Sequence, residues 1–303
     1  MVESIKIKNL KTDIIKRFDM SEADYLIYEG SVDWGNIRVT HSTFQFPQQI
    51  GLYVSNTTLG SRDVSINGWI IGNTLQDIES KKRSLSLFAN PLDEFQLIVG
   101  EYAINGNLNS NVTFGKTYKE NNAVAVKFLL QFTCPYPLFV LTNAITLDVS
   151  KFVGAFHFPL IIPEESGIIM GYRKQTLFQK VGNSGVVPVG MTVILEASGT
   201  VNNPTIVNTT THETLRINKI LSAGEKIVIN TLQGEHNVVG YNENGVESYL
   251  KYMDYDSLWL QVPPGVSTFS YATYDENGEQ DDTYLLLDVT IQYKTALFNL
   301  GDE

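Results

Sequence analysis

The stretch NSGVVPVGMTVILEASGTVNNPTIVNTTTHETLRINKILSAGEKIVINTLQGEHNVV, from Asn183 to Val239, decides the fold. Three runs within it alternate apolar and polar residues, at 191–198, 215–220 and 226–231. Successive side chains of a β-strand point to opposite faces, so this period of two predicts strands that each bury one face. The breaks between the runs are rich in Gly, Asn and Pro, which lets the chain reverse. Composition and periodicity therefore predict an antiparallel β-sandwich.

The same pattern continues on both sides of this stretch. The side chains expected to face the core are Met191, Val193, Leu195, Ala197, Leu215, Ile217, Ile227 and Ile229. Further strands are expected near 168–172, 176–181, 236–241, 258–262, 267–274 and 284–293. The pairs Asn244-Gly245 and Pro264-Gly265 predict turns between neighbouring strands.

The N-terminal half combines further strands with one helix. Strands are predicted at 5–10, 62–71, 95–99, 102–108 and 123–133. In the last of these, one face is expected to carry an apolar stripe of Val124, Val126, Phe128, Leu130 and Phe132. Thr74 is expected to cap a helix over 75–89, with Asp77 in its first turn, and Asn90-Pro91 is expected to end it. The apolar residues at helical spacing, expected to face the core, are Leu75, Ile78, Leu85 and Phe88. Pro47 places 43–52 on a sheet edge or in an extended arm. Two prolines in Cys134–Pro137 break the last strand and mark the end of the first domain.

The whole chain has the composition of a folded globular protein. Its 303 residues, 43% hydrophobic and 18% charged, fit two domains of ordinary size. The N-terminal residues lack the apolar core of a secretory signal, and no apolar run reaches the length of a membrane span, so no membrane insertion is expected. The lone cysteine, Cys134, suits folding in a reducing cytoplasm.

The charge of the chain disfavours binding of nucleic-acid phosphates. The formal net charge is −11, and Lys81, Lys82 and Arg83 form the one notable basic cluster, which is typical of a solvated helix face. An acidic excess would instead suit a surface along which DNA moves without sticking.

A search for catalytic or metal-binding residues finds candidates that each lack a required part. His212-Glu213 is followed by Arg216 where a zinc hydrolase needs a second histidine. The acidic loop 275–282 lacks the glycine and glutamate of a calcium loop, so a solvated hairpin tip is favoured there. Asp254 and Asp256 favour a turn over a glycosidase pair. Ser184 and Ser257 lack the glycines of a nucleophile elbow. No catalytic, metal or cofactor residues are therefore expected, and the chain is not expected to be an enzyme.

Several short motifs, in order, resemble the distal tail protein family of long-tailed bacteriophages. They cover most of residues 60–293. They are 62–68, the helix with Glu79, Lys82, Arg83 and Leu85, then 129–139, 156–160, 183–185, 203–208, 224–231, 257–260 and 264–265.

The resemblance implies a mainly β protein of two domains. Residues 1–140 would form a ring-forming, tail-tube-like β-barrel or sandwich with one packed α-helix, and residues 141–303 a galectin-like antiparallel β-sandwich. It further implies a structural virion protein, assembled in the host bacterial cytoplasm as a homo-hexamer ring at the distal end of the tail tube. The ring would bind the tail tube protein, the tail-tip protein and receptor-binding or baseplate proteins, and would continue the DNA channel without binding DNA specifically.

Two other functions compete with this interpretation. A galectin-like sandwich suggests a carbohydrate-binding module that recognises host cell-surface glycans, and the run Trp34–Arg38 contains residue types that such sites use. That run lies in the wrong half of the chain, and Trp259 has no Arg or His within three positions. A glycan-cleaving enzyme would need an acid/base pair, and none stands out.

Overall fold

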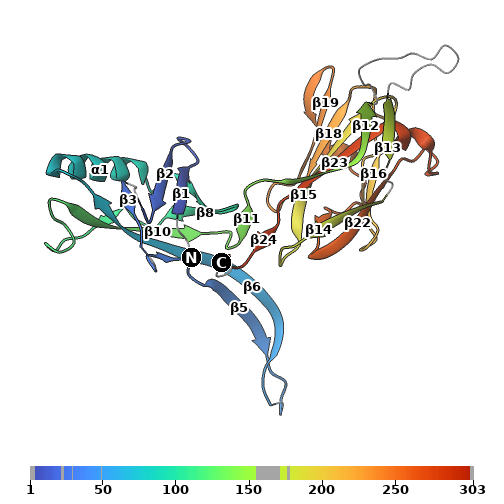
Figure 1. The fold of residues 1–303 in the computed structure, drawn as a ribbon. Helices are drawn as coiled ribbons and strands as arrows, with labels where there is room; N and C mark the ends of the chain where they lie inside the picture. The colour runs from blue at the N-terminus through green and yellow to red at the C-terminus, as the bar shows by residue number, and fades with distance from the viewer. Residues whose placement is uncertain are drawn as a thin grey trace. The chain divides into compact units, whose positions relative to one another are not determined.

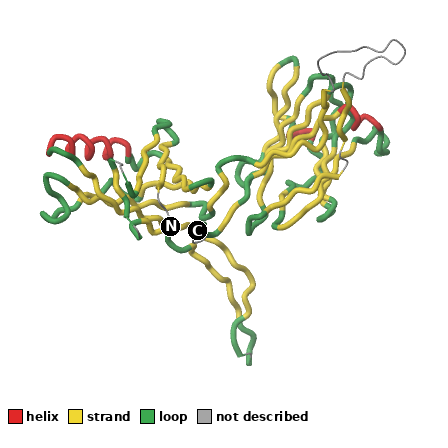
Figure 2. The backbone as a smooth tube through the Cα atoms, viewed as in Figure 1, coloured by secondary structure: helices red, strands yellow, loops and turns green. Residues whose placement is uncertain are grey.

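The computed structural model describes residues 4–21, 24–28, 30–48, 50–154, 171–175 and 178–300. The chain is mainly β, as predicted, and has one α-helix among these residues (Figures 1 and 2). It divides into two compact units. Unit 1 comprises Met1–Thr142 with Leu297–Glu303, and unit 2 comprises Asn143–Ala296. The family motif at 156–160 and parts of the strands predicted at 168–172 and 176–181 lie outside the described residues.

Unit 1 is built from short strands and one helix. Its strands are β1 (Ser4–Asn9), β2 (Ile15–Asp19), β3 (Tyr25–Leu26), β4 (Val32–Asp33), β5 (Ile37–Phe44), β6 (Tyr53–Ile71), β7 (Glu94–Val99), β8 (Tyr102–Leu108), β9 (Thr113–Phe114), β10 (Ala125–Cys134) and β11 (Phe139–Leu141). They pair in the order β11-β8-β7-β1-β2-β3-β6-β10-β9. A further pairing joins β8 to β10, with Phe132 opposite Leu108, so the sheet closes on itself as a barrel.

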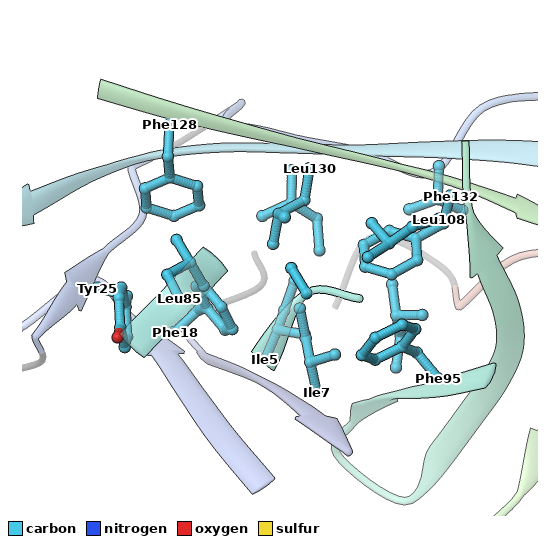
Figure 3. Packing of buried hydrophobic residues seen from close by; sticks show 14 of the residues in the cluster. Ile5, Ile7, Phe18, Tyr25, Leu85, Phe95, Leu108, Phe128, Leu130 and Phe132 are labelled. Atoms are coloured by element: carbon cyan, nitrogen blue, oxygen red, sulfur yellow. The ribbon is translucent and has the colours of Figure 1, made fainter. Parts of the chain in front are cut away.

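The interior of this barrel is filled by apolar side chains from every side (Figure 3). The predicted stripe on β10 is confirmed from Val126 to Phe132, where alternate residues are buried, whereas Val124 lies before the strand and is exposed. The labelled core residues are Ile5, Ile7, Phe18, Tyr25, Leu85, Phe95, Leu108, Phe128, Leu130 and Phe132.

The predicted helix is confirmed as α1 (Leu75–Phe88). Thr74 caps it, because its hydroxyl accepts a hydrogen bond from the backbone N–H of Asp77. Ile78 and Phe88 face the core as expected. Leu75 was expected on the same face, but it lies in the first turn and is exposed.

The last residues of the chain return to unit 1. Strand β24 (Ala296–Leu297) is the neighbour of β11 in the barrel sheet, and Leu300 packs on the core of unit 1. Residues 297–300 therefore cluster with unit 1, whereas the sequence predicts a second domain that includes all of 141–303. The apolar pattern of so short a strand does not reveal which sheet it joins.

Unit 2 contains two sheets. Its strands are β12 (Ile145–Gly154), β13 (Gly171–Gln175), β14 (Phe178–Asn183), β15 (Val189–Ala197), β16 (Thr205–Asn208), β17 (Glu213–Arg216), β18 (Lys226–Asn230), β19 (Asn237–Asn242), β20 (Gly245–Ser248), β21 (Gln261–Val262), β22 (Gly265–Ala272) and β23 (Leu287–Tyr293). One sheet has the order β13-β12-β23-β15-β18-β19-β20 and the other β14-β22-β16-β17. All pairings within them are antiparallel among the described strands, as expected of a galectin-like sandwich.

The predicted core faces of unit 2 are confirmed. Every apolar residue expected to face inward in 191–197, 215–217 and 227–229 is buried. Three strands are shorter than predicted: the strand at 215–220 ends at Arg216, the strand at 258–262 begins at Gln261, and the strand at 284–293 begins at Leu287. Before it, Asp282–Leu286 forms a short 3-10 helix, η2, because Asp281 caps this segment through the backbone N–H of Thr283.

The remaining helical segment is short. A second 3-10 helix, η1 (Leu250–Tyr252), follows β20. In the part of the chain that the structure describes, no helix is both long and apolar enough to cross a membrane.

Candidate assembly surface

The most exposed element of unit 1 is a long hairpin formed by β5 and the first half of β6, here called the arm (residues 37–61; Figure 1). The strands pair antiparallel from Ile37 opposite Arg62 to Phe44 opposite Tyr53, with two irregularities in the register. Side chains on both faces of the ribbon are exposed. A two-stranded ribbon with no core is only marginally stable in water, so a partner surface is expected to cover the arm.

The composition of the arm also indicates a buried interface. Between Arg38 and Arg62 the 23 residues 39–61 include no Asp, Glu, Lys or Arg. A solvent-exposed hairpin normally has charges that keep it soluble and prevent edge pairing. The cores of protein interfaces are depleted in charged residues. The arm therefore has the composition of an interface and the exposure of a free surface.

The tip of the arm concentrates aromatic side chains. The ring of Phe44 lies 5.0 Å from the ring of Phe46 and 4.9 Å from that of Tyr53, measured between centroids. Phe46 is 58% exposed, and Ile50 is fully exposed. Exposed apolar clusters of this kind mark protein interaction sites. Of the two placements predicted for 43–52, a sheet edge or an extended arm, the structure shows the arm: the described residues of this segment form its tip, and the arm is much longer than the segment.

The root of the arm is held by close packing and by one polar cluster. A Cβ on Gly35 would lie 2.0 Å from the Asp63 carbonyl oxygen, and Gly35 has a φ of +60°, so only glycine fits there. The Asp63 carboxylate accepts hydrogen bonds from the Thr133 hydroxyl at 2.6 Å and from the Arg38 guanidinium at 2.7 Å. These two contacts, Thr133 first, lower the pKa of Asp63. The carboxylate therefore stays ionised and ties β10 to both strands of the arm.

A polar hollow of about 490 Å³ lies on unit 1 beside β2. It is lined by Ile15, Lys16, Arg17, Asp19, Ser21, Asp24 and Tyr25. Arg17 pairs with Asp19, and Lys81 on α1 pairs with Asp24 at 3.0 Å. The backbone N–H of Ser21, and next Arg17, lower the pKa of Asp19. The Asp19 carboxylate is therefore held ionised beside Arg17, which does not suit it for acid/base work.

Three residues that the sequence offered as candidates for metal binding or catalysis lie in turns. His212 lies in the turn between β16 and β17 with a positive φ of 61°. Asp254 accepts a hydrogen bond from the side chain of Asn218 at 2.7 Å, and its carbonyl closes a turn with Ser257, as the sequence predicts. Asp275 uses its carboxylate to accept the backbone N–H groups of Asn277 and Glu279 at the predicted hairpin tip.

No metal centre is found in the described residues. Over the ranges within 4–300 that the structure describes, no three His, Cys, Asp or Glu side chains come together as a metal site. The basic cluster on α1 is only in part the solvated helix face that the sequence predicts. Arg83 is exposed, but Lys81 and Lys82 are partly buried, and they pair with Asp77 and Asp24 and with Glu79, respectively.

The aromatic residues considered for sugar binding have structural partners. Trp34 packs edge-on against Phe139 in unit 1, at 5.2 Å between centroids. Trp259 in unit 2 stacks on His236 at 4.6 Å with an angle of 11° between the rings. The sequence analysis missed this pair, because the two residues are far apart in the chain and meet only through the fold.

Comparison with known proteins assigns both halves of the chain. The phage tail protein RIFT-related domain matches residues 19–134, and the C-terminal domain of siphovirus-type tail components matches residues 184–295. Among curated protein sequences, none matches this chain.

Two solved structures share the fold over nearly the full length. The crystal structure of phage SPP1 Dit (gp 19.1), described as a paradigm of the hub adsorption apparatus in phages that infect Gram-positive bacteria, aligns with a TM-score of 0.63 and 13% identity. It covers 96% of this chain and 98% of that one. A chain of the phage P2 baseplate, in its activated conformation with Ca, aligns with a TM-score of 0.50 and 11% identity, covering 97% and 98%. The chain therefore belongs to the siphovirus distal tail and baseplate hub protein family and is a structural component of a phage tail.

Proposed function

We propose that this protein forms a homo-hexameric ring at the distal end of the tail tube, continuing the DNA channel. The observation that carries the proposal is the exposed arm of unit 1, which has no charged residue from 39 to 61. In a closed ring, each copy presents one surface to the next copy and receives a different surface from the previous one. An arm that projects from one side of each unit 1 would supply the first surface and bury its aromatic tip (Figure 1).

The receiving surface would lie on the opposite end of unit 1. Strand β6 starts in the arm and ends at Ile71, beside α1. There Ile71, Leu75 and Val124 are exposed, and the backbone N–H of Gly72 bonds to the carbonyl of Val124, which places these residues together. Strand β6 would thus begin in the arm that inserts into the next copy and end beside the apolar surface that receives the arm of the previous copy.

The other functions of the ring follow from the family. Unit 1 would dock on the last ring of tail tube protein and on the trimeric tail-tip protein, and unit 2 would hold receptor-binding or baseplate proteins. The protein would be assembled in the host cytoplasm and incorporated in the virion, without enzymatic activity and without a cofactor.

The charge of the channel wall would be low. Unit 1 has 16 acidic and 13 basic residues, and unit 2 has 17 acidic and 9 basic residues. Most of the acidic excess therefore belongs to the unit that would not line the channel. A nearly neutral wall would neither bind DNA phosphates nor repel them strongly. Replacing acidic residues of unit 1 by Lys should then slow DNA ejection by adding phosphate contacts.

The experiment compares oligomeric state in arm variants. Native mass spectrometry and negative-stain imaging of the wild-type protein, alone and with purified tail tubes, should give six-chain rings. A Phe44→Ser, Phe46→Ser, Tyr53→Ser variant should stay monomeric with an unchanged melting temperature. The matched control is Tyr255→Ser, which removes a fully exposed aromatic residue from unit 2 and should still form rings. A wild-type monomer in both settings would overturn the proposal.

Glycan binding by unit 2 is the competing function. An aromatic ring that binds a sugar has to present a free face, and one face of Trp259 is occupied by His236. A glycan array would test this, and binding that is lost in Trp259→Ala would favour the carbohydrate-binding alternative.

A further inference from the structure

Arg62 is a fully buried arginine at the point where the arm joins the barrel. Its side chain is 1% exposed, and by volume it heads the fully buried side chains of the described residues. It lies in β6 directly after the uncharged residues of the arm, opposite Ile37 on β5 and Cys134 on β10. Arginine keeps its charge in proteins, and a buried charge is costly unless it is paired and hydrogen-bonded.

The partners of this guanidinium come from distant parts of the chain. Its Nη2 donates hydrogen bonds to the carbonyl oxygen of Phe298 and, at 3.4 Å, to the side-chain oxygen of Asn299. Its Cζ lies 4.9 Å from the centre of the Phe139 ring, which is a cation–π contact. Phe139 belongs to β11, the last strand before the chain leaves unit 1, and Phe298 follows the point where the chain returns.

The pairing of Arg62 is incomplete. Its Nε and Nη1 have no hydrogen-bond partner, and in the described part of the chain no carboxylate forms an ion pair with it. The neighbouring Asp63 pairs with Arg38 instead. The positive charge is therefore met by one backbone carbonyl, one amide oxygen and one aromatic face. A methionine would fill the same volume without this cost, so packing alone does not explain an arginine here.

We propose that Arg62 is a positioning residue that fixes the C-terminal segment to the root of the arm. We call Arg62, Phe139, Phe298 and Asn299 the C-terminal clasp. One guanidinium contacts the exit strand β11 and the returning segment, and the backbone of Arg62 continues directly from the arm in β6. Both places where the chain crosses between the units are thus linked to the arm through a single side chain. The proposal rests on the contacts of unit 1 and holds whether or not the ring forms.

The test is hydrogen exchange on the full-length protein, read by mass spectrometry. In Arg62→Met, exchange should rise at least tenfold in peptides covering 139–141 and 296–300, because β24 loses its anchor. Peptides covering 95–99 and 126–132, in the barrel core, should stay within twofold of wild type. The control is Arg38→Met, which removes an exposed arginine from the neighbouring strand of the arm and should leave 139–141 and 296–300 unchanged.

A second variant keeps the test decisive if Arg62→Met does not fold. Arg62→Lys keeps the positive charge but replaces the planar guanidinium by a single ammonium group. Hydrogen exchange in peptides covering 139–141 and 296–300 should therefore rise by a smaller factor than in Arg62→Met. Exchange that stays at the wild-type level in both peptides would overturn the proposal. So would a rise of the same factor throughout the barrel, because Arg62 would then be a core residue with no specific hold on the C-terminal segment.

Discussion

The ring of Tyr249 occupies the space in front of Gly240, so that a Cβ on Gly240 would lie 2.1 Å from the ring. Gly240 lies in β19, and Tyr249 is a fully buried residue beside η1. The absence of a side chain at Gly240 is what lets the tyrosine pack flat against the sheet. Its hydroxyl can then reach Glu225, which anchors the turn before β18.

Gly240→Ala should therefore destabilise unit 2 by about 2–3 kcal/mol, because the methyl group displaces the ring of Tyr249 from its site. Denaturant unfolding followed by the fluorescence of Trp259, the one tryptophan of unit 2, measures this effect. The control is Gly182→Ala in β14, where an added Cβ meets nothing within 4 Å. Equal stability of the two variants would contradict the packing argument.

The ion pair beneath Tyr249 makes the stability of unit 2 depend on pH. Lys219 Nζ lies 2.6 Å from the Glu225 carboxylate, which is 5% exposed. Burial raises the pKa of Glu225, but hydrogen bonds from Lys219, Tyr249 and the Ser222 backbone outweigh it, so the pKa lies below its ordinary value. The contribution of Glu225 is therefore complete above its unfolded-state pKa and is lost as the pH falls through the lowered pKa.

Glu225→Gln should cost about 2–3 kcal/mol at pH 7, because a charged acceptor is replaced by a neutral one. The difference from wild type should shrink below the ordinary pKa of a glutamate. Urea unfolding at a series of pH values from 7 to 3 gives both free energies. A difference that is independent of pH over this range would show that the carboxylate charge is not involved.

The cap of α1 offers a small, local change in unit 1. Thr74→Ala removes the hydroxyl that accepts the Asp77 N–H at 3.2 Å and should cost about 1 kcal/mol. Thermal unfolding of unit 1 is the measurement. Ser80→Ala, at an exposed position in the middle of the same helix, should be neutral or slightly stabilising.

The barrel core should respond to truncation in proportion to burial. Phe128→Ala removes a ring that packs within 6.3 Å of both Phe18 and Tyr25, and should cost about 3–5 kcal/mol. Val124→Ala, at an exposed position just before the same strand, should change stability by less than about 0.5 kcal/mol. Denaturant midpoints compare the two, and a similar loss in both would contradict the assignment of the core.

Cys134 should serve as a reporter of unit 1 unfolding. Burial raises the pKa of its thiol to about 12, and its side chain is inaccessible. Since the thiolate is the reactive form, alkylation by iodoacetamide at pH 8 should be at least ~100-fold slower than for an exposed cysteine. Mass spectrometry across a urea titration should show labelling only as unit 1 unfolds, and rapid labelling of the native protein would contradict this.

The sequence predicted best the strands that bury one face. In β15 and β18 the alternation of apolar and polar residues matches the observed burial at each predicted position. The cap at Thr74 and the break after Cys134 were also readable, because they depend on local chemistry. Local periodicity and turn residues therefore carry most of the fold.

The arm could not be predicted in full for a physical reason. Both faces of 53–59 are exposed in one chain, so nothing there imposes an alternation of apolar and polar residues. The feature of the sequence that marks the arm is the absence of charged residues from 39 to 61. This absence reflects contact with a partner and not packing within the chain itself. The stack of His236 on Trp259 and the contact of Arg62 with Phe298 join residues that are distant in the sequence. No local sequence pattern predicts them.

The return of the last residues to unit 1 sets an order for synthesis. A ribosome releases β1 to β11 first, then all of unit 2, and only afterwards the strand that lies beside β11. Unit 1 thus lacks this strand until all the described strands of unit 2 from β12 to β23 have been made. Nascent chains on one messenger would then be poor substrates for premature polymerisation, since the arm root gains this neighbour only after unit 2 has been synthesised.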